Sequence, residues 1–244
     1  MASTLDSGLW FRRLTEAPAG APRLVCFPHA GGAASWYQPF AQHLQGRAEL
    51  VAVQYPGRQD RRSEPLIDDV RALADEIAPR LPDDRPLRLF GHSMGAMIAF
   101  EVALRREPDH LFVSGRRAPQ IVRDDRVHER DDAGLIAEVR RLAGTNASVF
   151  DDEDVVRMVL PAIRSDYRAA ETYRYRPGPA LTCPVTALTG DADPKASVDE
   201  VVQWCDRTTG PFRMKVLPGG HFFLSDNRSA VASVITGESP VPEL

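Results

Sequence analysis

Strand-like and helix-like patterns alternate along most of this sequence, and this alternation limits the possible folds more than any other feature. Short apolar runs are separated by longer stretches whose apolar residues recur every three or four positions. Such alternation is typical of β-α-β units, in which parallel strands form one sheet flanked by helices. The predicted strands are Leu9–Leu14, Arg23–Phe27, Leu50–Tyr55, Leu87–Phe90, Leu111–Ser114, Val185–Thr189 and Arg213–Leu217. The predicted helices are Trp36–Leu44, Asp68–Leu81, Ala96–Arg106, Val198–Thr208 and Arg228–Ile235.

One region, from about Pro119 to Leu181, interrupts the alternation. It contains polar turns and two helical segments but no convincing strand, so we expect residues 1–244 to form a single α/β domain with a helical lid inserted at about 119–181. Either Asp151 or Asp152 can cap the second helical segment, and Pro161 should kink or split it. The small residues between the two segments are Gly144, Thr145 and Asn146.

A pentapeptide with the pattern Gly-x-Ser-x-Gly joins one predicted strand to the helix that follows it. It reads Gly91-His92-Ser93-Met94-Gly95 and lies between the strand that ends at Phe90 and the helix that begins at Ala96. A sharp turn of this kind holds a serine hydroxyl exposed in a strained conformation, and small flanking residues let the backbone bend. Because the pattern alone is common, its position between strand and helix is what makes Ser93 the candidate nucleophile.

Candidates for a base and an acid follow two later strands. Gly190-Asp191-Ala192-Asp193-Pro194 comes directly after one strand, and Pro218-Gly219-Gly220-His221 comes after the next. In open α/β sheets, functional residues lie just past the carboxyl ends of the strands. A serine nucleophile needs a nearby base and a carboxylate that holds the base in the right tautomer. We therefore expect His221 to be the base, and the chain order Ser, Asp, His is that of α/β hydrolases.

Two carboxylates compete for the role of the acid. Turn geometry favours Asp193 and leaves Asp191 as a turn former that bonds its own backbone two residues further on. His92 is next to Ser93, but its side chain must point elsewhere from a sharp turn. A packing role is therefore expected for His92.

A second cluster of small residues follows the predicted strand Arg23–Phe27. It reads Pro28-His29-Ala30-Gly31-Gly32, at the place where this fold supplies one of the two main-chain amides that stabilise an oxyanion. We expect the N–H groups of Ala30 and Met94 to be the two donors. The side chain of His29 is expected to be supportive at best.

Together these motifs resemble the type II thioesterases of polyketide and nonribosomal peptide assembly lines, which belong to the α/β-hydrolase superfamily. The resemblance extends from about Trp10 to about Asp226, and no candidate catalytic position departs from it. The motifs that carry it are Phe27-Pro28-His29-Ala30-Gly31-Gly32, Tyr55-Pro56-Gly57-Arg58, Gly91-His92-Ser93-Met94-Gly95-Ala96, Phe112-Val113-Ser114-Gly115-Arg116-Arg117-Ala118-Pro119, Gly190-Asp191-Ala192-Asp193 and Gly219-Gly220-His221-Phe222-Phe223-Leu224.

The resemblance implies an α/β-hydrolase fold, with a mostly parallel central sheet flanked by helices and an inserted helical lid. It also implies hydrolysis of stalled or wrongly loaded acyl groups from the phosphopantetheine arm of an acyl or peptidyl carrier protein, through an acyl-enzyme on Ser93. Such a reaction requires no metal or redox cofactor. The family pattern, like the turn geometry, favours Asp193 as the acid.

Two rival functions remain open on the sequence alone. A general carboxylesterase or a cyclising thioesterase would use the same triad and oxyanion hole, because these groups do not encode the leaving group. A non-catalytic binding member of the fold usually lacks a triad residue. Ser93, Asp193 and His221 are all present, which argues against this second rival.

The apolar face of the second lid segment also has two interpretations. Its residues could simply pack onto the sheet, or part of the face could line an acyl pocket, with Leu160, Ile163 and Tyr167 as the candidates. The arginines Arg58, Arg116 and Arg117 could meet an acidic carrier protein or the phosphate of its arm. They could equally be solvated surface residues.

Charge, apolar runs and residue spacing argue against several other classes of protein. The formal net charge of −4 gives no overall attraction to nucleic acid or anionic lipid. The apolar runs are shorter than the ~20 residues that span a membrane, and the N-terminus does not have a signal-peptide pattern. The 3 cysteines are widely spaced, which fits a reducing compartment, and the 6 histidines show no metal-ligand spacing. We therefore expect a cytoplasmic protein that binds neither nucleic acid nor membranes. A monomer is the expected state, although none of these features determines it.

Overall fold

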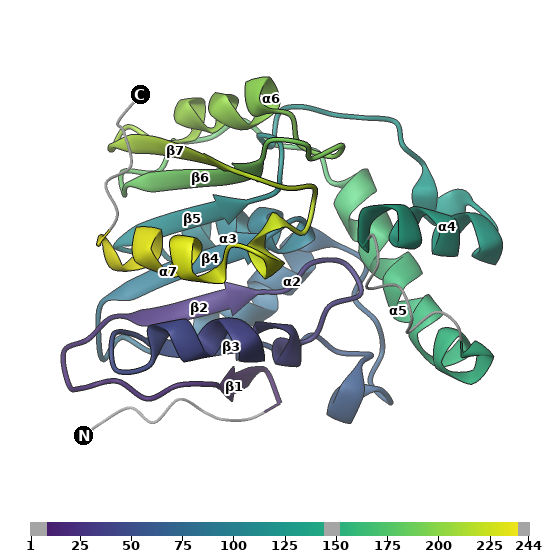
Figure 1. Cartoon of the computed structure of the whole chain (residues 1–244), viewed down its shortest axis with the longest axis horizontal. Helices are drawn as coiled ribbons and strands as arrows, with labels where there is room; N and C mark the ends of the chain where they lie inside the picture. The colour runs from purple at the N-terminus through teal and green to yellow at the C-terminus, as the bar shows by residue number, and fades with distance from the viewer. Residues whose placement is uncertain (1–8, 144–151, 239–244) are drawn as a thin grey trace.

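The computed structural model describes residues 9–143 and 152–238, and within these residues seven strands form one sheet (Figure 1). Their order is β1-β3-β2-β4-β5-β6-β7; β1 pairs antiparallel with β3, and every other neighbouring pair is parallel. The mostly parallel sheet expected from the sequence is thus confirmed. The strands are β1 (Phe11–Arg13), β2 (Arg23–Phe27), β3 (Glu49–Val53), β4 (Leu87–His92), β5 (His110–Ser114), β6 (Val185–Gly190) and β7 (Phe212–Leu217).

Helices cover both faces of the sheet, which explains why the inner strands are almost continuously apolar. All five residues of β2 are buried, and their side chains alternate between the two faces. Leu24 and Cys26 pack in the core under α1 and α7, whereas Val25 and Phe27 pack in the core under α2 and α3. The helices are α1 (Gln38–Ala41), α2 (Val70–Ile77), α3 (Met94–Arg105), α4 (Asp132–Ala143), α5 (Glu153–Thr172), α6 (Val198–Val202) and α7 (Arg228–Thr236).

Several predicted helices are built from short pieces rather than from one regular helix. The predicted helix at residues 36–44 consists of α1 between two 3₁₀ helices, and the one at residues 198–208 consists of α6 followed by a 3₁₀ helix. The capping box of Ser197 and Glu200 begins α6, and the carboxylate of Asp69 caps α2. The 3₁₀ helices are Ala34–Tyr37, Gln42–Leu44, Gln59–Arg61, Ala78–Arg80, Val127–Glu129, Gln203–Arg207 and Phe223–Ser225.

Helices α4 and α5 lie beyond the carboxyl edge of the sheet, on the right in Figure 1, and share an apolar cluster formed with the 3₁₀ helix Val127–Glu129. Asp152 caps α5, whereas Asp151 and the small residues 144–146 lie outside the described residues. Pro161 does not split α5, which continues through it to Thr172. The proline is on the exposed side of the helix, where water can bond the carbonyl that it frees, while the opposite side is held by packing.

Two observations bear on the environment of the protein. All three cysteines are free; Cys26 and Cys183 are buried and Cys205 is exposed. Among the described residues, no helix combines the length and the apolar character needed to cross a lipid bilayer.

Candidate active site

Ser93 lies in the sharp turn between β4 and α3. Its backbone has φ 56° and ψ −117°, a conformation that is strained for a residue with a side chain. The turn is tight enough to require the flanking glycines: a Cβ atom on Gly91 would lie 2.2 Å from the carbonyl oxygen of Gly95, and one on Gly95 would lie 2.0 Å from that of Phe27. Sequence and backbone therefore agree that the pentapeptide forms a nucleophile-elbow turn.

The imidazole of His221 bridges Ser93 and Asp193. Its Nε2 atom lies 2.9 Å from Oγ of Ser93, and its Nδ1 atom lies 3.0 Å from each carboxylate oxygen of Asp193. Since a carboxylate only accepts, Nδ1 carries the proton in this arrangement and Nε2 is free to accept from the hydroxyl. Both His221 and Asp193 are buried, at 4% and 7% exposure, so the two hydrogen bonds are protected from water.

The two aspartates that compete for the acid position have different partners. Only Asp193 contacts His221; Asp191 is exposed and accepts a hydrogen bond of 2.9 Å from the N–H of Gly219. The expected bond of Asp191 to its own backbone two residues on is wrong: Asp193 makes that bond, to the N–H of Lys195 at 2.8 Å. Asp191 instead links the loop after β6 to the loop after β7, because these neighbouring strands end side by side.

Ala30 and Met94, the expected oxyanion donors, line one cavity together with Ser93 and His221. This cavity has a volume of about 50 Å³. Met94 is the first residue of α3, and the first N–H groups of a helix have no partner within the helix. The N–H of Ser93 itself is occupied by the carbonyl of Ser114, at 2.8 Å.

A larger groove of about 480 Å³, also lined mostly by apolar surface, adjoins this cavity and shares His29, Ala30 and Tyr167 with it. Ile163 and Tyr167 of α5 line the groove, facing Trp36 and Phe222. Leu160, the third candidate for an acyl pocket, is not among the residues that line either space. It packs with Val127, Leu135 and Ile163 between the two helices, so the face of α5 both packs and lines a groove. 

Two histidines beside the site are held neutral by burial. Desolvation, reinforced by the neighbouring His221, lowers the pKa of His29 to about 4 and that of His92 well below its usual value. His29 donates through Nδ1 to the carbonyl oxygen of Ala30, at 2.9 Å. His92 stacks on Trp36 and its Nδ1 lies 2.9 Å from Oγ of Ser114, which agrees with the packing role expected for it.

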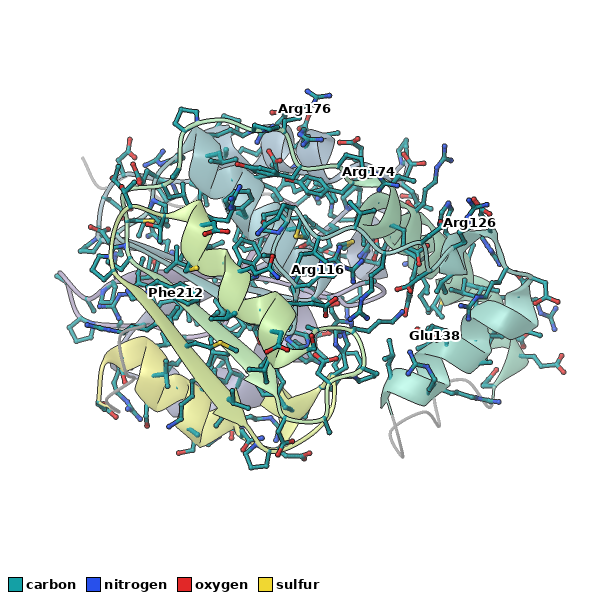
Figure 2. The ribbon with its side chains drawn as sticks, turned by 90° about the horizontal axis from the view of Figure 1, so that it is seen from above. Arg116, Arg126, Glu138, Arg174, Arg176 and Phe212 are labelled. Carbon is teal, nitrogen blue, oxygen red and sulfur yellow. The ribbon has the colours of Figure 1, made fainter. Side chains whose placement is uncertain are left out.

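None of the three arginines singled out in the sequence is a solvated surface residue. The side chain of Arg58 is 9% exposed, Arg117 is buried and Arg116 is half-buried; in the view of Figure 2 Arg116 lies well inside the outline of the molecule, whereas Arg126 and Arg176 lie nearer its edge. Arg116 lines the cavity beside Ser93 and donates to the carbonyl of Ala170 at 3.0 Å. Burial, together with the adjacent Arg117, lowers its pKa to about 9.

The sequence did not indicate the partner of Arg58, which is Asp166 on α5. Two parallel hydrogen bonds of 2.8 Å join the guanidinium to the carboxylate, whose side chain is fully buried. The sequence does contain a pattern that could have revealed a buried carboxylate here, because Asp166 falls at helical spacing between Ile163 and Ala170 on the apolar face of α5. A carboxylate on a buried face requires a partner there.

The site offers no ready metal centre among the residues that the structure describes. Within residues 9–143 and 152–238, no group of three or more His, Cys, Asp or Glu side chains is placed to hold a metal ion.

A sheet of this topology, with a serine in a strand-to-helix turn and a hydrogen-bonded His and Asp on later loops, defines an α/β hydrolase. A family model described as "Thioesterase domain" matches residues 22–238. The chain therefore belongs to the thioesterase family, whose members are hydrolases that act on thioesters.

Two individual thioesterases are similar to this chain over most of its length. Thioesterase PikA5 of Streptomyces venezuelae is 49% identical over 95% of this chain and 86% of its own length. The probable cadicidin biosynthesis thioesterase of Streptomyces griseus is 52% identical over 93% of this chain, which spans 64% of that protein's length.

Solved structures agree with these relatives. The type II thioesterase BorB from the borrelidin biosynthetic cluster matches with a TM-score of 0.87 and 49% identity, covering 94% of this chain and 97% of BorB. YbtT, a type II thioesterase from the yersiniabactin pathway, matches with a TM-score of 0.84 and 28% identity, covering 93% of this chain and 97% of YbtT. The resemblance to type II thioesterases of polyketide and nonribosomal peptide biosynthesis is confirmed.

Proposed function

We propose that this type II thioesterase hydrolyses acyl thioesters from the phosphopantetheine arm of acyl or peptidyl carrier proteins, and so removes stalled or wrongly loaded acyl units. One observation carries the chemical part of the proposal: Ser93, His221 and Asp193 form a continuous hydrogen-bonded chain at the carboxyl edge of the sheet. The carrier-bound substrate is inferred from relatives whose names place them in cadicidin biosynthesis, in the borrelidin biosynthetic cluster and in the yersiniabactin NRPS/PKS pathway.

The proposed roles follow from the geometry. His221 takes the proton of Ser93 through Nε2 while Oγ attacks the thioester carbonyl, and the N–H groups of Ala30 and Met94 stabilise the oxyanion that forms. Collapse of this intermediate breaks the carbon–sulfur bond, and the imidazolium returns its proton to the leaving thiol. Asp193 keeps the ring oriented and stabilises its cation.

The second half-reaction releases the acid. Water loses a proton to His221 and attacks the acyl-serine carbonyl, and the proton then returns to Oγ of Ser93. Every group in this scheme is a side chain, a main-chain amide or water, so the proposed reaction uses neither a metal nor a redox cofactor.

We propose that α4 and α5 form a lid over the site within a single domain. Ile163 and Tyr167 of α5 line the groove that adjoins the cavity beside Ser93. Because this groove is mostly apolar, we assign it to the acyl chain, with the carbonyl carbon beside Ser93. We further propose that the protein acts as a cytoplasmic monomer, in keeping with its free cysteines.

Intact-protein mass spectrometry of acyl carrier proteins tests the proposal. Incubation with the enzyme should remove the mass of the acyl group and leave the phosphopantetheine arm, whereas Ser93→Ala should leave the acyl carrier unchanged. A general carboxylesterase would instead turn over a p-nitrophenyl ester of the same acyl group at least as efficiently as the carrier substrate, which would contradict the proposed substrate. If Ser93 of the purified protein did not react with a fluorophosphonate, the proposal that it is a catalytic nucleophile would be contradicted.

A further inference from the structure

The carboxylate of Asp166 links helix α5 to the loop that contains Ala30. Besides its two hydrogen bonds to Arg58, it accepts one of 2.7 Å from the main-chain N–H of Gly31. Arg58 in turn donates to the carbonyl of Gly32 at 3.2 Å. A fully buried carboxylate from α5 and an arginine from the loop after β3 therefore hold two consecutive residues of this loop.

Helix α5 also packs directly on the same loop. A Cβ atom on Gly31 would lie 2.8 Å from Cγ1 of Ile163, and Gly31 has φ +75°, so a larger residue would be both crowded and strained. Ile163 precedes Asp166 by three residues, and the two side chains lie on one face of the helix. The absence of a side chain at Gly31 is what allows the carboxylate to reach the amide.

These contacts fix both ends of one peptide group. Its carbonyl oxygen, on Ala30, accepts from His29, and its N–H, on Gly31, donates to Asp166. A peptide group is planar, so anchoring both ends restricts the rotation of Ala30 and hence the direction of the Ala30 N–H.

We propose that Asp166 is a positioning residue for the reaction: it holds the oxyanion loop so that the Ala30 amide faces the cavity beside Ser93. This inference rests on the proposed role of Ala30 in the preceding section. The pair that Asp166 forms with Arg58 fits such a role, because a buried ion pair is seldom worth more to stability than apolar packing of similar volume. Here it supplies directed hydrogen bonds that apolar side chains could not.

The expected effect falls on the transition state. The oxyanion exists only after attack, so a displaced Ala30 amide should lower kcat and leave KM nearly unchanged. Small misplacements of catalytic groups cost on the order of 10²-fold in rate. We expect a loss of about this size in Asp166→Asn, which keeps the shape of the side chain but not its charge.

The experiment compares Asp166→Asn and Arg58→Lys with wild type and with Arg168→Gln. Arg168 is the matched control, since it lies on α5 two residues from Asp166 and pairs at the exposed surface with Asp68, at 3.0 Å. The substrate is p-nitrophenyl acetate, which needs Ser93 and the oxyanion hole but no carrier protein. Asp166→Asn should lose about 10²-fold in kcat. Arg58→Lys should lose some activity because lysine cannot bridge both oxygens, but less than Asp166→Asn because it keeps the charge and leaves Asp166 in place. Arg168→Gln should match wild type.

A trifluoromethyl ketone that forms an oxyanion adduct with Ser93 separates positioning from stability. Its affinity for the folded variants should fall with kcat, whereas a purely structural role would lower the melting temperature and leave the affinity of the folded fraction unchanged. Wild-type kcat and ketone affinity in folded Asp166→Asn would overturn the proposal, and if that variant does not fold, the same result in Arg58→Lys would do so. Because the ester assay needs no carrier, failure of the carrier-protein proposal would appear separately, as absence of carrier turnover by wild type.

Discussion

Asp193 presents both carboxylate oxygens to Nδ1 of His221, each at 3.0 Å, while Asp191, two residues earlier in the same turn, faces the N–H of Gly219. The two carboxylates thus separate into one that orients the imidazole and one that joins neighbouring loops. Sequence alone left both in contention for the first role.

The first prediction compares these aspartates. Asp193→Asn should lower kcat by on the order of 10⁴, because an amide would stabilise the wrong tautomer of His221. Ser93→Ala and His221→Ala should each remove nearly all turnover, since nucleophile and base act as a unit. Asp191→Asn should be much milder. Steady-state kinetics on folded proteins decides the assignment, and a greater loss in Asp191→Asn than in Asp193→Asn would reverse it.

The inner strands could be predicted from sequence because they are buried on both faces and therefore read as unbroken apolar runs; β2 was predicted to the residue. The positions of Ser93, Asp193 and His221 could be predicted for a related reason. Each follows the carboxyl end of a strand, and parallel strands bring these ends to one edge. Local pattern and topology together were sufficient.

The Arg58–Asp166 pair could not be predicted in this way. Its members are 108 residues apart, and they meet only because α5 docks on the loop after β2. Docking of an inserted helix depends on shape and packing rather than on strand order. For the same reason the sequence could not decide which residues on the inner face of α5 line the groove and which, like Leu160, pack against α4 and its neighbours.

The second prediction concerns the oxyanion hole. Ala30→Pro deletes the proposed donor and should lower kcat by roughly 10²–10³, the range for loss of one such hydrogen bond. Ala30→Gly keeps the N–H and serves as the matched control, with kcat expected near that of wild type. If the folded proline variant turned over substrate as fast as Ala30→Gly, the Ala30 amide would not be part of the hole.

A third prediction concerns stability in acid. Burial, with Arg88 and Arg213 acting in the same direction, lowers the pKa of His110 to about 4. Unfolded chains protonate histidine near pH 6.5, so between pH 6.5 and about 4 the unfolded state binds more protons than the folded state. The free energy of unfolding must therefore fall as the pH is lowered through this window, by up to about 1.4 kcal/mol per pH unit for each such histidine.

His110→Gln tests this linkage because His110 begins β5, at the opposite end of the strand from the site. His29 and His92 contribute in the same direction in both proteins. Urea unfolding at several pH values between 7 and 5 gives the free energy of unfolding as a function of pH. This free energy should depend less steeply on pH in the variant, by an amount that corresponds to at most one bound proton. Equal slopes for the two proteins would show that His110 protonates alike in the folded and unfolded states.

The last prediction concerns the groove between α5 and the core. Ile163 lines this groove, and so does Val139 on α4, whereas Leu160, one turn before Ile163, packs inside the α4–α5 cluster. If the groove holds the acyl chain, Ile163→Trp and Val139→Trp should shorten the longest chain that is accepted and leave acetyl and propionyl turnover nearly intact. Leu160→Trp is the matched control: it should lower stability by about 1–3 kcal/mol through overpacking, without changing the ranking of acyl chains.

Measuring kcat/KM over a series of acyl chain lengths, together with thermal unfolding, separates the possible outcomes. Val139→Trp is informative beside Ile163→Trp, because Ile163 also packs on Gly31 and its replacement can disturb the oxyanion loop at every chain length. A loss in Val139→Trp that grows with chain length would support the assignment of the groove to the acyl chain. A loss that is equal at every chain length, with unchanged stability, would instead assign the groove to the arm that all substrates share. An equal loss with lowered stability would show that these groove residues only pack in the core.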